Sequence, residues 1–312
     1  MSDSSDSLCH DSAPPSVARH PPRLPRLTQA HAELVQSVQV LNERGEPESI
    51  QIPAERPLTV YVDRRELVTL MTLGAQPELL VLGYLRNQRL VESVDEIESI
   101  TVDWEVNAAA VATRHGIARI EERTAQKVVT TGCGQGSVFG GLMDEVDRIR
   151  LPQAQITQAD LYALVNAMRL HESTYKSAGS VHGCALFQGP ELRVFVEDVG
   201  RHNAIDTIAG WMWMQGPGQP GGATMGGQDK VFYTTGRLTS EMVIKSAQMG
   251  VPIVVSRSGM TQMGHAVAQQ LGLCAIGRAM NRRFVCYTAP HRLVWQPELA
   301  EAPAVLRERT SS

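Results

Sequence analysis

Short β-branched runs and amphipathic helices alternate along the second half of the chain. The runs KVFYTT (230–235), VPIVVS (251–256) and LCAIG (273–277) are separated by the segments TSEMVIKSAQMG (239–250) and TQMGHAVAQQLG (261–272), and glycines lie at the junctions. Strand, short loop, helix and strand in this order are typical of βαβ units, in which helices cover both faces of a sheet. The alternation therefore predicts an α/β core.

Three further elements are expected in the same half of the chain. TQADLYALVNAMRLHE (157–172) begins with a Thr157/Asp160 capping pair and places apolar residues on one face, which predicts a helix. VHGCALF and LRVFVE, joined by QGPE, predict a hairpin over 181–197. A helix is predicted for 203–214 and a last strand for 284–288.

The first half of the chain has a different pattern. Strand-like pieces, SIQIP, LTVYVD and SITVDWEV, surround one helical segment at 77–91. We therefore expect a disordered tail, a small α+β portion, an α/β domain and a C-terminal tail, over residues 1–32, 33–128, 129–292 and 293–312. The Gly/Pro-rich stretch 215–229 is expected to be a solvated linker.

Composition excludes several classes of protein. A net charge of −4 argues against a general nucleic-acid-binding surface. Five widely spaced cysteines fit neither a disulfide framework nor a zinc ribbon, which indicates a reducing compartment. No apolar run approaches the ~20 residues of a membrane span. We expect a soluble cytoplasmic protein that binds neither nucleic acid nor membrane.

One cysteine lies in an unusual setting. Cys133 follows a β-branched run in VVTTGCGQGSVFGG (128–141) and is flanked by glycines, whose backbone freedom favours a displayed loop over a packed core. A glycine-rich turn can direct backbone N–H groups at a thiolate, so this thiol is expected to be reactive. Cys184, Cys274 and Cys286 lie among strand-forming apolar residues and are expected in the core.

Three loops place glycine and arginine where a strand gives way to a helix. EDVGRHN, TTGRLTSE and SRSGMTQ carry Arg201, Arg237 and Arg257, and free backbone N–H groups at such helix starts bind phosphates. Loops at the carboxyl ends of strands gather along one sheet edge, so the three arginines are expected to converge on an anionic ligand. The alternative is that the hydroxyls are ordinary caps and the arginines ordinary surface charges.

Two histidines are considered as ligands. A zinc deaminase needs H-x-E followed by P-C-x-x-C, but His182 precedes Gly183 and Cys184, and P-C-x-x-C is absent, so no metal is expected. His182 is instead expected to be a structural or ligand-contacting group. His202 would orient Asp198 or Asp206, touch the ligand, or belong to a helix-capping network.

Several long motifs resemble one known family. FVEDVGRHNAID (195–206), TTGRLTSEMVIKSAQMGVPIVVSRSGMT (234–261) and SAGSVHGCAL (177–186) are similar to signatures of the formate dehydrogenase accessory sulfurtransferase family, FdhD. PELLVLGYLRNQRLVES (77–93) and AIGRAMNRRFVCYTAPHRL (275–293) extend the resemblance, which covers about residues 33 to 292.

The resemblance implies a specific activity and fold. Family members take sulfur from a cysteine desulfurase and pass it to the molybdenum cofactor, a bis(molybdopterin guanine dinucleotide), before formate dehydrogenase receives that cofactor. The implied fold is α/β, with a cytidine deaminase-like three-layer core and a mixed sheet, and the implied assembly is a homodimer. The molybdenum cofactor would be a bound substrate, and no permanently bound cofactor is expected.

The resemblance also assigns residues. Cys133 matches the sulfur-bearing cysteine of the family. The cofactor-binding stretch matches Arg278, Ala279, Met280, Asn281, Arg282 and Arg283, and we add Arg201, His202, Arg237 and Arg257 as further candidates for holding the cofactor.

The chain departs from the family pattern at one position. The loop usually reads C-G-x-C-G, but residue 136 is glycine, so Cys133 has no neighbouring thiol. This favours a single persulfide carrier over exchange between two loop cysteines. The departure also leaves open a non-catalytic chaperone that binds the cofactor for formate dehydrogenase without moving sulfur.

Overall fold

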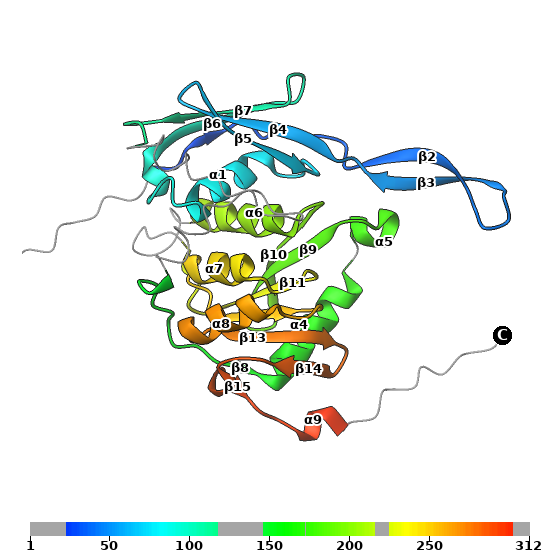
Figure 1. The fold of residues 1–312 in the computed structure, drawn as a ribbon, viewed down its shortest axis with the longest axis vertical. Helices are drawn as coiled ribbons and strands as arrows, with labels where there is room; N and C mark the ends of the chain where they lie inside the picture. Colours follow the sequence, from blue (N-terminus) through cyan, green and yellow to red (C-terminus); the bar gives the residue numbers. More distant parts are fainter. Residues whose placement is uncertain (1–22, 118–145, 172, 216–224, 302–312) are drawn as a thin grey trace, which may run out of the picture.

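A computed structural model describes residues 23–117, 146–171, 173–215 and 225–301, which build two main sheets joined by a pair of packed helices (Figure 1). The expected loop around Cys133 and most of the expected linker 215–229 lie outside the described residues.

The N-terminal portion is built on a five-stranded sheet. Its order is β1-β6-β7-β4-β5, and its strands are β1 (Arg26–Leu27), β4 (Arg56–Val62), β5 (Arg65–Thr72), β6 (Ile97–Asp103) and β7 (Ala108–Thr113). Helix α1 (Pro77–Asn87) packs against β6 and β7, and the 3₁₀ turn η1 (Val94–Glu96) leads into β6. The helix and the strands predicted at 58–63 and 99–106 are confirmed, although β6 ends before the predicted Trp104–Val106.

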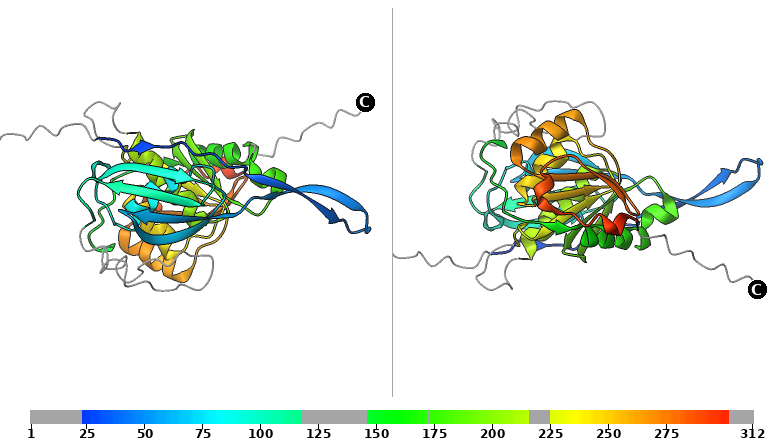
Figure 2. Two further views of the ribbon diagram at one scale, coloured as in Figure 1. Left: turned by 90° about the horizontal axis from the view of Figure 1, so that it is seen from above. Right: turned by 90° about the horizontal axis from the view of Figure 1, so that it is seen from below.

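A two-stranded arm projects from this portion (Figures 1 and 2). Strands β2 (Val35–Leu41) and β3 (Pro47–Pro53) pair antiparallel, from Val35 opposite Pro53 to Leu41 opposite Pro47. The sequence predicted only the second of these strands. The short helix α5 (Thr174–Ala178) packs beside β3 and so connects the arm to the rest of the molecule.

The second sheet has six strands in the order β10-β9-β11-β12-β13-β14. Its strands β11, β12 and β13 are mutually parallel, whereas β9 and β14 run antiparallel to their neighbours. This confirms the expected mixed sheet. The strands are β9 (His182–Gln188), β10 (Glu191–Asp198), β11 (Lys230–Thr234), β12 (Ile253–Ser256), β13 (Cys274–Met280) and β14 (Arg283–Cys286).

Helices cover both faces of this sheet. Phe232 and Val254 point to the cluster formed with α6 (Arg201–Met214), α7 (Ser240–Gln248) and α8 (Gln262–Leu271). Tyr233 and Val255, one residue further along each strand, point to the cluster with α4 (Gln158–Leu170). Side chains alternate between the two faces of a strand, and both faces of this sheet are buried. The central strands therefore need apolar residues at nearly every position, which explains the near-continuous apolar runs in the sequence.

Helix α4 begins as its sequence predicts. The Thr157 hydroxyl accepts a hydrogen bond from the Asp160 backbone N–H at 3.0 Å, which satisfies one of the free donors at the helix start. Leu161, Leu164 and Val165 are buried against the sheet. The opposite face of α4 is therefore available to line a cavity.

The two halves meet where α1 crosses α6. A Cβ on Gly83 would lie 1.6 Å from the Asp206 carbonyl oxygen, and one on Gly210 would lie 2.1 Å from the Leu79 carbonyl oxygen. Only glycine at both positions allows the two backbones to come this close.

The predicted tails need correction at both ends of the described chain. Within the predicted disordered tail 1–32, β1 pairs with β6, and the Thr28 hydroxyl donates to Glu78 at 2.6 Å. Within the predicted C-terminal tail, β15 (Leu293–Val294) pairs with β8 (Ile156–Thr157), after the turn η2 (Pro290–Arg292) and before helix α9 (Glu298–Glu301). Each of these strands has only two residues, so neither gives the alternation of apolar and polar residues by which a strand is predicted from sequence.

Among the described residues, the apolar stretch of every helix falls short of what crossing a membrane requires.

Candidate functional site

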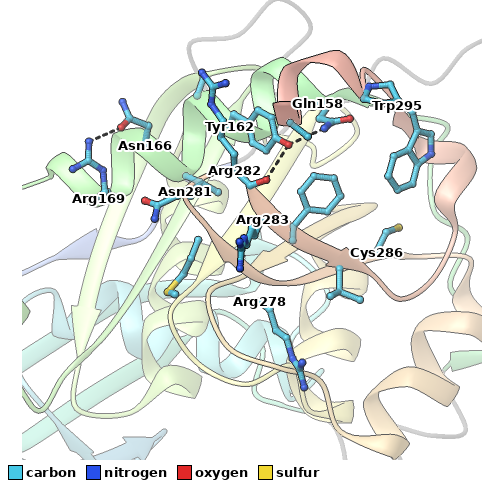
Figure 3. Close-up of a pocket in the computed structure, with 17 residues that line it drawn as sticks. Gln158, Tyr162, Asn166, Arg169, Arg278, Asn281, Arg282, Arg283, Cys286 and Trp295 are labelled. Carbon is cyan, nitrogen blue, oxygen red and sulfur yellow. Dashed lines mark hydrogen bonds between the residues drawn. The ribbon is translucent and has the colours of Figure 1, made fainter. Parts of the chain in front are cut away.

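A large cavity of about 1740 Å³ lies between α4 and the hairpin formed by β13 and β14, and Figure 3 shows residues that line it. One wall is the free face of α4, and the other is the hairpin. The segment after β15 closes a third side through Trp295 and Pro297. The lining of the cavity includes Gln158, Tyr162, Asn166, Arg169, Arg278, Met280, Asn281, Arg282, Arg283 and Cys286.

The cavity is strongly cationic. Its described lining contains four arginines, Arg169, Arg278, Arg282 and Arg283, and no aspartate or glutamate. Guanidinium groups bind phosphate oxygens through paired N–H donors, so this lining suits a phosphate-bearing ligand. Arg278, Arg282 and Arg283, which the sequence predicted as a local anion site, therefore line one cavity, and anion binding there stays a prediction.

The backbone explains why these arginines gather. A register shift lies between Gly277 and Met280, and Arg278 within it has φ +53°. The Arg278 N–H donates to the Ser258 carbonyl at 2.7 Å, which fixes this bulge to the loop after β12. Bulges redirect side chains. Met280 and Arg283 are then paired across a two-residue turn whose first residue, Asn281, has φ +54°.

The segment assigned by resemblance therefore divides in two. Five of its six residues, Arg278, Met280, Asn281, Arg282 and Arg283, line the large cavity. Ala279 is 2% exposed and lines only a smaller cavity next to it.

This smaller cavity has a volume of about 310 Å³ and shares Val165, Arg169, Met280 and Asn281 with the large one. Arg257 and Lys176 also line it, together with Phe195 and Tyr233. Burial raises the pKa of Tyr233 to about 12, although Arg257 acts in the opposite direction, so this phenol stays protonated at neutral pH. The two cavities form adjoining compartments that combine cations with aromatic surface.

The loops that carry the three predicted arginines lie side by side. Thr235 N–H donates to the Gly183 carbonyl at 2.9 Å, and Arg257 N–H donates to the Thr234 carbonyl at 3.0 Å. Arg257 faces the small cavity. Arg201 and Arg237 lie near His182 and line neither of these two cavities. The three arginines therefore do not all line one cavity.

His182 is held in its neutral form. Burial lowers its pKa below the ordinary value, and the charges of Arg201 and Arg237 lower it further. Within the described ranges, no three His, Cys, Asp or Glu side chains come together as a metal site would require.

A buried carboxylate lies beside the start of α6. The Asp198 carboxylate accepts hydrogen bonds from Gly200 N–H at 3.0 Å, from the Asn203 side-chain amide at 2.7 Å and from Leu73 N–H at 3.1 Å. Phosphate binding by the first N–H groups of α6 stays a prediction. Because Leu73 follows β5, this motif ties the two halves of the molecule together.

His202 lies in the interior, away from the predicted ligand. Its side chain is 3% exposed, its Nε2 is 3.2 Å from a Glu241 carboxylate oxygen, and it is absent from the lining of both cavities. This contact joins α6 to α7, and a role of His202 in orienting Asp198 or Asp206 or in touching the ligand stays a prediction. The Asp206 carboxylate beside it accepts from Lys245 at 2.8 Å and from Asn87 at 2.7 Å.

The described cysteines divide into two kinds. Cys184 is fully buried, its thiol donates to the Thr234 hydroxyl at 3.3 Å, and burial raises its pKa to about 12. Cys274 is also fully buried, so the prediction of core positions is confirmed for both. Cys286 differs, because it is half-buried and lines the large cavity. Cys133 lies outside the described residues.

Sequence reasoning missed the wall contributed by α4. Gln158, Tyr162 and Asn166 recur every four residues, and Arg169 follows three residues later, which is the spacing of one helix face. Gln158 donates to the Tyr162 hydroxyl at 2.8 Å, and this hydroxyl donates to the Arg282 carbonyl at 3.1 Å, as Figure 3 shows. This row of polar residues on one helix face could have indicated a cavity wall, but the same pattern is typical of a helix face that is exposed to solvent.

Comparison with known proteins gives consistent results. The model of the FdhD/NarQ family matches residues 53–294. The sulfur carrier protein FdhD of Bacillus subtilis is 30% identical over 254 residues, which cover 80% of this chain and 94% of that protein. The sulfur carrier protein FdhD of Staphylococcus aureus (strain MRSA252) is 26% identical over 245 residues, with 78% and 89% of the two chains covered.

A solved structure shares the fold. It is the crystal structure of a protein assigned as a formate dehydrogenase accessory protein from Desulfotalea psychrophila. The TM-score is 0.67 at 24% identity, with 83% of this chain and 98% of that chain covered. The similarity therefore extends over both sheets and the helices between them.

Proposed function

This chain belongs to the FdhD/NarQ family, and on that premise we propose that it is a sulfur carrier protein that serves formate dehydrogenase. The observation that carries the proposal is the four-arginine cavity, because it lies at the segment that the family resemblance assigns to cofactor binding. We propose that the substrate bound there is the molybdenum cofactor with its two guanine dinucleotides. Their diphosphates match the guanidinium groups, and their rings match the aromatic surface next to them.

The sulfur-transfer step is assigned to Cys133. Its thiolate attacks the outer sulfur of a persulfide on a cysteine desulfurase, forms a new persulfide on Cys133 and releases the desulfurase thiolate. The exchange is redox-neutral and needs no second thiol in the loop, which agrees with glycine at position 136. The outer sulfur would then pass to the metal of the bound substrate as sulfide, with two electrons supplied by the metal itself or by an external reductant, and Cys133 would return to its thiolate form.

The proposal includes a setting for this chemistry. A homodimer in the cytoplasm, with a desulfurase and formate dehydrogenase as partners, is the expected assembly. The six-stranded mixed sheet with helices on both faces supports the proposed relationship to the cytidine deaminase fold.

Peptide-resolved mass analysis tests the sulfur step. The full chain is incubated with a cysteine desulfurase and cysteine, and its peptides are mapped for an added mass of about 32 Da, one sulfur atom. We expect the adduct on the peptide that contains Cys133. Cys9→Ala, a change in the N-terminal tail, is the matched control and should retain it. An unmodified Cys133 peptide in the loaded protein would refute the assignment.

The non-catalytic chaperone remains the competing function, because the loop lacks its second cysteine. Complementation of a deletion strain separates the two. If the chain carries sulfur, Cys133→Ala still binds guanosine diphosphate but restores no formate dehydrogenase activity. If the chain only holds the cofactor, the same variant restores activity.

A further inference from the structure

Two cysteines lie on one face of the neighbouring strands β13 and β14. In the antiparallel pairing of these strands, Ile276 lies opposite Cys286. Cys274 is two residues from Ile276 and therefore shares its face of the sheet. Both cysteine side chains belong to the apolar cluster on the side of the sheet that α4 covers.

The environments of the two thiols are unequal. Cys274 is fully buried. Cys286 is half-buried and belongs to the wall of the large cavity, which Trp295 also lines (Figure 3). Its thiol donates to the Thr288 carbonyl at 3.5 Å. Only Cys286 is therefore accessible to a molecule in the cavity.

We propose that Cys286 is a second sulfur-accepting thiol, built into the wall of the cavity that holds the four arginines, with Cys274 as the residue that positions and polarises it. The Cys286 thiolate attacks the outer sulfur of a donor persulfide or polysulfide. One S–S bond forms at Cys286, one S–S bond breaks in the donor, and the donor leaves as a thiolate. The step transfers one neutral sulfur atom and consumes no external oxidant or reductant.

The electrostatic setting favours Cys286 as the nucleophile. The hydrogen bond from Cys274 lowers the pKa of Cys286, although partial burial opposes this, and the same pairing with burial raises the pKa of Cys274 far above its ordinary value. Arg292 lies near Cys274, and the cavity that Cys286 lines is also lined by Tyr162 and Arg169 of α4 and by the hairpin residues Arg278, Arg282 and Arg283. Persulfides form at thiolates, so the lowered pKa of Cys286 favours its reaction.

The position of Cys286 gives this chemistry a use, and that use rests on the proposed function. Because residue 136 is glycine, the loop of Cys133 offers one thiol where the family pattern has two. Cys286 supplies a second thiol at the place where the cofactor is expected, so a sulfur atom held there would be close to its destination.

Sulfur acceptance is tested on the full chain carrying Cys133→Ala, with inorganic tetrasulfide as donor and peptide mass mapping as readout. We expect an added mass of about 32 Da at Cys286, formed at least about tenfold faster than at buried Cys274. The further change Cys286→Ser should remove that adduct and leave Cys274 unmodified. Equal, slow modification of Cys274 and Cys286 would overturn the proposal.

The role of Cys274 is tested by the pH dependence of alkylation. With iodoacetamide, the midpoint for Cys286 should move to higher pH in Cys274→Ala, because the thiolate loses its hydrogen-bond donor. Circular dichroism establishes that the variant is folded, and Cys274→Ser, which restores a donor, should return the midpoint toward that of the parent chain. An unchanged midpoint in folded Cys274→Ala would remove Cys274 from the proposal.

The location in the cavity is tested by protection. Saturating guanosine diphosphate should slow alkylation of Cys286 and leave that of Cys9 unchanged, whereas equal rates with and without the nucleotide would contradict the shared site. Failure here is distinguishable from failure of the proposed function. Desulfurase loading of the Cys133 peptide is measured in Cys286→Ser, and tetrasulfide loading of Cys286 is measured in Cys133→Ala, so each thiol is tested in the absence of the other.

Discussion

Two regions of this molecule are rich in charge, and they use it in opposite ways. Between α6 and α7, Lys245 and Asp206 are both fully buried and joined at 2.8 Å, with Glu241 close to the same ammonium group. In the cavity beside α4, four arginines line the wall with no carboxylate among the described lining residues, and one of them, Arg282, donates to the Leu299 carbonyl at 2.9 Å. The first region neutralises its charges with opposite charges of the protein, and the second does not, which suits the proposed binding of an anion.

The comparison separates two classes of motif that look alike in the sequence. EDVGRHNAID and SEMVIK are charged and unusual, yet Asp198, His202, Asp206 and Lys245 are all buried in contacts between elements. RAMNRR carries similar charges, but most of its side chains lie on the cavity wall. A distinctive motif therefore marks either a packed interface or a binding site, and burial decides which.

The largest expected loss of stability comes from removing the cation of the buried Lys245–Asp206 pair. Lys245→Met keeps the apolar stem but leaves Asp206 and Glu241 buried without their cation, and removing one partner of a buried pair costs about 3–5 kcal/mol. Urea unfolding followed by circular dichroism measures this loss. Arg193→Met is the matched control, since its surface pair with Glu191 is worth at most about 1 kcal/mol. Equal stability of the two variants would contradict a structural role for Lys245.

The second substitution tests the close contact between α1 and α6. Gly83→Ala places a Cβ at 1.6 Å from the Asp206 carbonyl oxygen, so α1 and α6 must move apart. Overpacking of this kind costs about 1–3 kcal/mol. Gly259→Ala is the control, because its nearest neighbour is a tyrosine hydroxyl at 4.0 Å. The melting temperatures of the two variants provide the measurement, and similar values would show that the crossing tolerates a side chain.

The third test concerns ligand binding by the arginines of the cavity. Arg282→Ala and Arg283→Ala should each weaken guanosine diphosphate binding by about 10- to 100-fold, because a hydrogen bond to a charged group is worth about 1.5–3 kcal/mol. Titration calorimetry measures the affinity, and unfolding measurements should show little change. Arg26→Ala, whose side chain is 80% exposed and pairs with Glu98, is the control. Loss of stability without loss of affinity would assign these arginines to the fold.

The smallest expected effect is a pH dependence at His182. Its pKa is lowered in the folded chain, so the unfolded chain takes up the proton first as the pH falls below the ordinary value of 6.5. The contribution of His182 to stability is therefore complete above pH 6.5 and is lost on acidification. In His182→Gln this decline should be absent. Unfolding curves from pH 7.5 to 5 for both chains measure the difference, and parallel curves would show that His182 has no shifted pKa.

The sequence predicted the regular part of the fold because its periodicity is strong there. Apolar runs such as VPIVV are buried on both faces of β12, and Thr157 caps α4 through Asp160 as the spacing indicates. Strand β5 was missed because the apolar residues of ELVTLM do not alternate with polar ones. Strand β7 was missed because AAAVAT is rich in alanine, which gives little strand signal. Two-residue strands such as β1 and β15 depend on pairing with distant residues and leave no local pattern.

The site was predictable in part for a related reason. The cluster at Arg278, Arg282 and Arg283 is local in the sequence, and one hairpin brings it together. The wall from α4 lies over a hundred residues away, so only tertiary structure places Tyr162 beside Arg282. Cys286 was expected in the core because it lies in a strand, but β14 is an edge strand, and its side chain reaches the cavity.

The most direct test is a crystal structure of the full chain with guanosine diphosphate. We expect the diphosphate in the cavity between α4 and the β13–β14 hairpin, within hydrogen-bond distance of Arg282 or Arg283. A diphosphate bound instead at Arg201 and Arg237, beside His182, would show that the loops at the helix starts hold the ligand and that the arginine cavity does not.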